Sequence, residues 1–422
     1  TASSGFAWTI TNQGRISGPG NGIVLSATGA VLNSGTIAGT NGVVLDAGGS
    51  VQNSGGGVVN GSDYGVTIAG GAATVVSAGT IGGGGGTAVQ FGAGDDLLAV
   101  YPGAVFNGRV LGGAGDNGLE LTAGNGAGTL FGLGSKFRNF AAIQIDPGAV
   151  WRLSGAPATA PDFTNDGRIV VGGGHTLLLG AVGEDPGAHG AIVVRSGGTI
   201  EFAGGVDPQQ TLRFADNTGT LVLDDPQDFG ATIRGFQSGD AIDLAGAAAD
   251  GMSYADGVLT LLSGDDPVAA LAIPGGFSAS QFAVTPDGRG GTTVTTVPAQ
   301  LFAFTCVYDD GQAYYQGTVA DDGSLGYAAI AQSADPTITV PGGVYTLAAD
   351  GPTSEPSGAV RVADYFDSPP QANGAQGFVP LATGRGQFDG SGGLGSEADA
   401  IRVNGTTFGF SPSLEFHPIL AA

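Results

Sequence analysis

The sequence predicts an all-β protein whose larger part is a right-handed parallel β-helix and whose smaller part is an antiparallel β module. Three observations support this fold class. The pattern Asn-x-Gly-x-Ile returns with a period of about 20 residues, and short apolar runs separated by Gly, Asn and Ser fill each period. No segment has helical periodicity or helix-capping signals.

The first repeats set the length of one coil. The pattern stands at 12–16, at 33–37 and, shortened, at 53–55, and its Gly-x-Ile half returns at 79–81. One unit of this length cannot bury its apolar side alone, so successive units have to stack. We therefore expect each repeat to be one coil of a solenoid.

Two further apolar runs complete each coil. The runs after Gly-x-Ile occupy 23–25, 43–45, 66–68 and 88–91, and those before the next Asn occupy 30–32, 50–52 and 73–75. Three strands this short, separated by turn residues, predict a triangular coil. We expect the Asn and Gly of the corners to adopt positive φ, and stacked Asn side chains to form an amide ladder.

Less regular coils follow residue 100. A contracted copy of the repeat stands at 107–112, a good copy stands at 164–169, and the strand rhythm continues to 292–295. A Gly-rich run at 287–291 then precedes a change in composition. These features predict a parallel β-helix over 1–296 and a separate module over 297–422.

The second module lacks the 20-residue period and collects aromatic residues. Its Asp-Asp-Gly triplets at 309–311 and 321–323 are typical of hairpin turns. The strands predicted around them are 301–308, 313–319 and 324–329. We expect an antiparallel, β-sandwich-like module with long loops, whose aromatic side chains either pack in a core or form a carbohydrate-stacking surface.

The composition excludes several classes of partner. Asp and Glu number 37 against 13 Lys and Arg, for a formal net charge of −24. Such a surface repels nucleic acid and anionic membranes, and no apolar stretch is long enough for membrane insertion. The single cysteine, Cys306, cannot form a disulfide within the chain, so stability has to come from stacking.

Two segments, 92–98 and 112–119, look like fragments of the calcium-binding nonapeptide repeat. In that repeat, Asp carboxylates and corner carbonyls of neighbouring turns surround the cation. The candidate calcium ligands are Asp95, Asp96, Asp116 and Asn117. The alternative interpretation is a pair of acidic corners without metal, and no other cofactor is expected.

An enzyme on this fold would need clustered carboxylates, or basic residues beside a calcium on one face. The candidate carboxylates, which occur singly on separate strands, are Glu120, Asp146, Glu201 and Asp243. The arginines of the second half are Arg138, Arg152, Arg168, Arg195, Arg213 and Arg234. Neither His175 nor His189 has a nearby metal-ligand partner, and no nucleophile elbow or phosphate-binding loop is present. We predict no enzymatic activity.

The segments 31–39, 41–45, 149–155 and 235–244 resemble passenger repeats of bacterial autotransporter and filamentous-haemagglutinin-type adhesins. The resemblance covers roughly 1–296 and leaves the C-terminal module unassigned. It implies a secreted bacterial β-helix that projects from the cell. The acidic, Lys-poor composition also resembles substrates of type I secretion, so export by that route and a cleaved autotransporter both stay open.

A parallel β-helix exposes unpaired backbone groups at its ends unless a cap covers them. The first strand, with Phe6, Trp8 and Ile10, follows no recognisable cap and predicts a self-assembly end. Our leading hypothesis is an extracellular or cell-surface protein that assembles head-to-tail into a filament or layer for adhesion or a biofilm matrix. The alternatives are a monomeric adhesin with a glycan-binding C-terminal module, and a polysaccharide lyase or hydrolase. Expected partners are further copies of the chain and surface or matrix polysaccharide.

Overall fold

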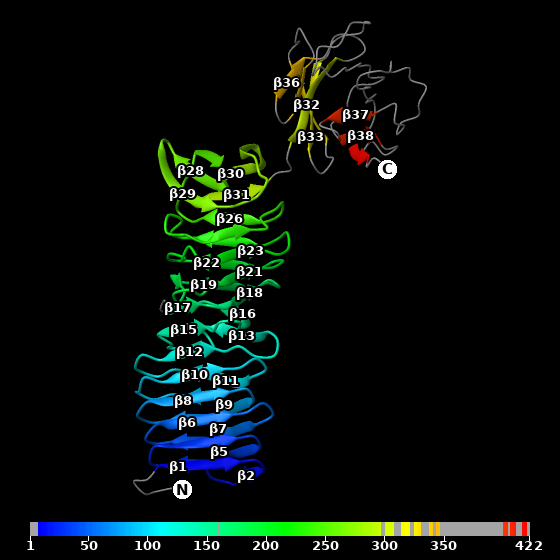
Figure 1. Cartoon of the computed structure of the whole chain (residues 1–422). Coiled ribbons are helices and arrows are strands. Elements are labelled where there is room, and N and C mark those ends of the chain that lie inside the picture. Colours follow the sequence, from blue (N-terminus) through cyan, green and yellow to red (C-terminus); the bar gives the residue numbers. More distant parts are fainter. Residues whose placement is uncertain are drawn as a thin grey trace. The chain divides into compact units, whose positions relative to one another are not determined.

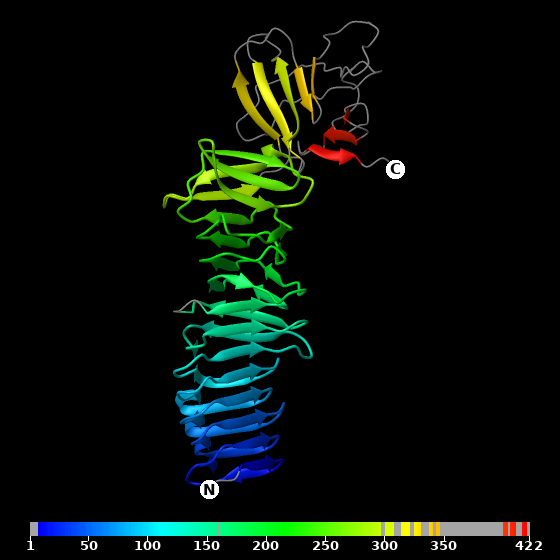
Figure 2. The same ribbon diagram turned by 60° about the vertical axis from the view of Figure 1, so that its left-hand side comes forward.

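The computed structural model describes residues 7–157 and 161–296, together with the backbone of the strands in the remainder of the chain. The chain divides into two units, Thr1–Thr296 and Val297–Ala422. In the first unit, parallel strands pile into a β-solenoid of about 11 turns, which both views show from β1 to β26 (Figures 1 and 2). The predicted parallel β-helix is therefore confirmed.

Each regular coil contributes a strand segment to three parallel stacks. The first stack contains β1 (Trp8–Asn12), β4 (Gly29–Asn33), β6 (Gly49–Asn53), β8 (Ala73–Ser77), β10 (Leu97–Val100), β12 (Gly118–Leu121), β15 (Ala142–Ile145), β17 (Asp162–Asn165) and β20 (Val182–Gly183). The second stack contains β2 (Arg15–Ser17), the beginnings of β5 (Thr36–Leu45), β7 (Val58–Ile68), β9 (Thr80–Gln90) and β11 (Val105–Leu111), then β13 (Gly128–Leu133), β16 (Val150–Gly155), β18 (Arg168–Val171), β21 (Ala191–Val194), β23 (Thr211–Phe214) and β25 (Thr232–Arg234).

The third stack closes the coil. It contains β3 (Ile23–Leu25), the ends of β5, β7, β9 and β11, and then β14 (Phe137–Arg138), β19 (Thr176–Leu179), β22 (Thr199–Phe202), β24 (Thr220–Leu223) and β26 (Ala241–Leu244). The stacking is in register, so that Val31 lies over Val51 and Ile37 over Val59. All four side chains are fully buried. Burial of these apolar columns is the main stabilising contribution of the solenoid.

The expected amide ladder is present at one corner. The Asn12 Nδ2 group donates to Asn33 Oδ1 at 2.8 Å, and the Asn33 Nδ2 group donates to Asn53 Oδ1 at 2.8 Å. Asn33 Nδ2 also donates to the carbonyl oxygen of Val58 at 3.2 Å. Because each of these asparagines is buried, the ladder satisfies polar groups that water cannot reach.

The positive φ expected at the corners is found at glycines of other corners, such as Gly48 and Gly71, but the expectation is wrong for the corner of the amide ladder. Among the residues that the structure describes, the non-glycine residues with positive φ are Asn139 and Asp256, and the ladder asparagines are not among them. Gly35 does not have positive φ either. A Cβ atom there would collide with the carbonyl oxygen of Gly14 in the coil below. Glycine is needed at this position because two backbones approach closely, not because of its left-handed conformation.

Parallel stacking ends at β26, before the predicted boundary at residue 296. Two antiparallel strands follow it, β31 (Thr292–Thr296) beside β26 and β30 (Phe282–Pro286) beside β31. The segment between contains β27 (Gly251–Ala255), β28 (Val258–Ser263), β29 (Asp266–Ala272) and the 3-10 helix η1 (Ala279–Gln281). Residues 251–296 therefore form an antiparallel cap, which corrects the expectation of parallel coils there.

Hairpin chemistry explains this correction. Asp256 has φ 51° and Gly257 has φ 79°, so both central residues of the β27–β28 turn are left-handed. An Asp-Gly pair of this kind favours the turn that reverses a strand, whereas a solenoid corner lets the chain continue around the coil. Strand length and apolar alternation are the same in a hairpin and in a solenoid coil, so these two features do not distinguish them.

In the second unit, the described strands are antiparallel. One five-stranded sheet contains β32 (Gln300–Val307), β33 (Tyr314–Ala320), β34 (Leu325–Ile330), β35 (Thr337–Val340) and β36 (Gly343–Thr346), and a three-stranded sheet contains β37 (Ala400–Val403), β38 (Thr406–Phe410) and β39 (Phe416–Ile419). The predicted Asp-Asp-Gly turns lie outside the described residues. None of the described elements is a helix long and apolar enough to cross a membrane.

Candidate functional site

The second stack carries a groove lined by arginines. Its volume is about 580 Å³. The lining residues are Ala127, Val150, Arg152, Arg168, Val170, Ala191, Val193, Arg195, Thr211, Arg213, Ala215 and Asp216. Four of the 13 basic residues of this acidic chain therefore border one groove.

Strand register brings these arginines together. Trp151, Ile169 and Ile192 point into the core and lie over one another, so the residues that alternate with them point outward. On that outer face Arg152 lies beside Val170, and Arg213 lies beside Val193 on one side and Arg234 on the other.

Five successive coils each place one arginine on this face. The arginines are Arg152 on β16, Arg168 on β18, Arg195 after β21, Arg213 on β23 and Arg234 on β25. Neighbouring strands lie about 4.8 Å apart, so the five positions span about 19 Å along the solenoid axis. We call these five residues the arginine row.

The floor of the groove is made of small apolar side chains. Val170, Ala191 and Val193 are half-buried between the arginines. Gly172 lies against Arg195, and a Cβ atom at Gly172 would approach the Arg195 Cβ atom to 2.7 Å. A larger residue at position 172 would therefore displace Arg195.

The guanidinium groups of the arginine row are not neutralised by neighbours. Within 7–157 and 161–296, none of them has a hydrogen-bond or ion-pair partner. Asp216 borders the groove, where its Oδ2 atom accepts a hydrogen bond from the Ser196 backbone N–H group at 3.2 Å. Arginine stays protonated at any physiological pH, so the groove is a local positive patch on an acidic protein.

An aromatic pair lies beside the beginning of the row: Phe131 belongs to β13, one coil before Arg152, and His175 follows β18 in the coil of Arg168. Thr129 on β13 pairs with Arg152, and Phe131, two residues later, pairs with Ser154. The Phe131 side chain is 39% exposed although it is large and apolar. Its ring centroid lies 4.3 Å from that of His175, with 34° between the ring planes. The two rings form a partly exposed platform, which we call the aromatic platform.

Three of the four predicted calcium ligands, Asp95, Asp96 and Asn117, use a side-chain oxygen in a hydrogen bond between coils. Asp96 Oδ1 accepts from the Ala73 N–H group at 2.7 Å, and Asn117 Oδ1 accepts from the Asp96 N–H group at 2.9 Å. Asp95 Oδ1 accepts from the Asp116 N–H group at 2.9 Å. Burial of the Asp96 carboxyl raises its pKa. In the described part of the chain, no three acidic, histidine or cysteine side chains converge as metal ligands.

The predicted self-assembly end is described in part. Phe6 lies outside the described residues. Trp8 is 48% exposed, and Ile10 is half-buried against the core. The strand partner of β1 is β4, and the opposite edge of β1 has no partner in the described ranges.

The carboxylates noted in the sequence do not line the groove. Asp146 is the most perturbed of them, because burial, the charge of Glu120 and a hydrogen bond with Glu120 raise its pKa to about 6. Burial also raises the pKa of Glu201, beside Asp224, and the pKa of Asp243. These carboxylates lie apart from the arginine row, so the groove lacks the paired acids of a glycoside hydrolase.

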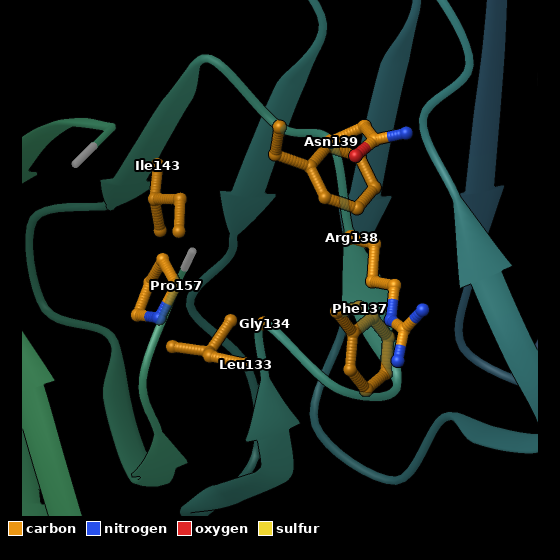
Figure 3. Close-up of a pocket in the computed structure, with 8 residues that line it drawn as sticks. Leu133, Gly134, Phe137, Arg138, Asn139, Ile143 and Pro157 are labelled. Carbon is orange, nitrogen blue, oxygen red and sulfur yellow. The ribbon is translucent and has the colours of Figure 1, made fainter. Parts of the chain in front are cut away.

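Arg138 belongs to a different cavity (Figure 3), of about 380 Å³. Leu133, Ile143 and Pro157 lie on one side of it, and Phe137 and Asn139 lie near Arg138 on the other. The Arg138 Nε group donates to the Ser135 carbonyl oxygen at 2.8 Å. Because the guanidinium of Arg138 is already bonded within its own turn, this cavity presents no convergent set of free polar groups.

Comparison with known proteins adds no assignment, since no protein-family model, no curated protein and no solved structure matches the chain. The fold and the site together define a class: a β-solenoid with an arginine row on one lateral face.

Proposed function

We propose that this chain is an extracellular, surface-associated β-solenoid whose arginine-lined groove binds a linear polyanion. The observation that carries the proposal is the arginine row, with one guanidinium in each of five successive coils and no acceptor for any of them in the described ranges. Isolated surface arginines are common, whereas a periodic row matches a partner whose charges also repeat along one direction.

The acidic character of the whole chain makes this row informative. A net charge of −24 opposes the approach of anions in general. Binding of a polyanion therefore depends on close contact with the guanidinium groups, which recognise carboxylate, sulfate and phosphate through paired hydrogen bonds. The likeness of the repeats to bacterial adhesin passengers supports an extracellular location and a role in adhesion or a surface matrix.

Removing two arginines from the row tests the proposal. We expect Arg168→Ala combined with Arg195→Ala to weaken polyphosphate binding at least about tenfold at low salt. The slope of log affinity against log salt concentration should become shallower by about 1.4, because two phosphate contacts are lost. Fluorescence anisotropy of labelled polyphosphate at several salt concentrations measures both quantities.

The matched control is Arg15→Ala combined with Arg109→Ala. It removes the same net charge from exposed positions outside the groove. An equal loss in the control, or no polyphosphate binding by the unmodified protein, would refute the proposed function.

A second candidate function is assembly with further copies of the chain, favoured by the edge of β1 that has no strand partner among the described residues. The Asn12 Oδ1 atom accepts a hydrogen bond from the Gly14 N–H group of the same coil at 3.3 Å, and its second lone pair is available. An asparagine in a strand laid on β1 would donate to it, as Asn12 donates to Asn33. Trp8, exposed beside this edge, supplies apolar area for the contact.

Electron microscopy at micromolar concentration tests assembly. We expect end-to-end particles or filaments, and we expect Trp8→Glu to convert them to monomers because it places a charge in the contact. Monomers of the unmodified protein at neutral and acidic pH, with or without calcium, would contradict this candidate and leave polyanion binding unaffected.

A further inference from the structure

We infer that the polyanion is an acidic polysaccharide, with one sugar ring stacked on the aromatic platform while its carboxylate or sulfate groups pair with the arginine row. This inference rests on the proposed function, because it names the chemistry of the partner in the same groove. The observation behind it is independent of charge: Phe131, a large exposed aromatic residue, lies on the arginine-bearing face.

The aromatic platform has the properties of a sugar-binding surface. Stacking with His175 holds the Phe131 ring in place, so a ligand does not have to order it. The apolar C–H face of a pyranose ring covers such an aromatic face and leaves the hydroxyl and acidic groups at its edge. Those groups then lie near Arg152 and Arg168, because the platform spans the coils from β13 to β18 and these coils include both arginines.

The repeat of the arginine row also suits a polysaccharide. Extended acidic polysaccharides carry one acidic group on every sugar or on every second sugar, an interval comparable with the rise of one or two coils. Thr129 on β13 pairs with Arg152 on β16, and Val150 on β16 pairs with Arg168 on β18. The strands that carry Phe131, Arg152 and Arg168 are therefore adjacent in one continuous parallel stack. A single extended chain can reach both the aromatic platform and the arginine row.

The floor of the groove argues against single-stranded nucleic acid. Proteins that bind such strands stack successive bases on several aromatic side chains. Here Val170, Ala191, Val193 and Ala215 separate the arginines, and the aromatic platform stands only at one end. Aliphatic residues give a sugar chain a smooth contact surface and offer bases no stacking partners.

The test compares four ligands by isothermal titration calorimetry on the full chain: polygalacturonate (carboxylate), dextran sulfate (sulfate), polyphosphate (no sugar) and oligo(dT). We expect Phe131→Ala to weaken binding of at least one acidic polysaccharide about fivefold to tenfold and to leave polyphosphate binding unchanged. Phe131→Tyr keeps the ring and should restore the affinity. Whether polygalacturonate or dextran sulfate responds identifies the acidic group.

Tyr101→Ala is the matched control, because Tyr101 is 40% exposed but follows β10 of the first stack, whereas Phe131 lies on the second stack with the arginine row. No change with Phe131→Ala, an equal loss for polyphosphate, or tighter binding of oligo(dT) than of either polysaccharide would overturn the inference. In these cases the proposed function still stands if polyphosphate binding depends on the arginine row. Absence of binding to every polyanion would overturn both.

Discussion

Replacing Trp151 with alanine is expected to lower the free energy of unfolding by about 3–5 kcal/mol. The Trp151 side chain is 1% exposed and is among the largest that the core buries completely. Its ring lies against Gly128 in the preceding coil, where a Cβ atom would collide with it. Its Nε1–H group donates to the Thr122 carbonyl oxygen at 3.1 Å, so the substitution also leaves a buried acceptor without a partner.

The position within the solenoid adds to this effect. Each coil of a solenoid contacts only its neighbours, so a cavity at Trp151 weakens the contact between the N-terminal and C-terminal coils. Urea unfolding followed by far-UV circular dichroism measures the loss. Trp8→Ala is the control, because Trp8 is 48% exposed, and it should change stability by about 0.5 kcal/mol or less. Similar losses for the two tryptophans would contradict the described packing.

The amide ladder provides the second prediction. Asn33→Ala should lower the free energy of unfolding by about 2–4 kcal/mol, because it removes two ladder hydrogen bonds and leaves the Asn53 Oδ1 atom buried without its donor. The loss should be seen in urea unfolding and as faster amide hydrogen exchange in the coils of β4 and β6.

The chain supplies a matched control for Asn33. Asn41 Nδ2 donates to Asn21 Oδ1 at 3.0 Å, in an equivalent contact between neighbouring coils that is exposed to water. Asn41→Ala should therefore cost about 1 kcal/mol or less, since water replaces the lost partner. If Asn33→Ala costs no more than Asn41→Ala, burial of the ladder is not a source of stability.

Repetition made the solenoid predictable from the sequence. Each repeat must bury the same positions, so the coil length, the three apolar runs and the stacked asparagines can be found by comparing the sequence with itself. The conformation of a turn is harder to predict from the sequence than the position of a strand, as the antiparallel cap of residues 251–296 illustrates. Val258 to Leu261 alternates like a coil strand, and only the Asp256-Gly257 pair before it marks the reversal.

The arginine row was not predictable, although its members were recognised as basic residues of the second half. Their separations along the chain are irregular, from 16 residues between Arg152 and Arg168 to 27 between Arg168 and Arg195. Corner loops of unequal length intervene between these coils. Stacking aligns the strands whatever the loop length, so arginines from neighbouring columns of one outer face come to lie in successive coils. Phe131 was missed for a related reason, because an exposed aromatic residue and a buried one look alike in an alternating strand.

By itself, the sequence determined that the first unit is a stack of short parallel strands around a Val, Ile and Leu core, because repeats of three short apolar runs without helical periodicity bury their apolar residues by stacking on one another. The tertiary structure decided where stacking ends and which side chains share a face. Strand register and turn handedness set these features, and both depend on contacts between residues far apart in the chain. The arginine row and the aromatic platform are features that the tertiary structure decided.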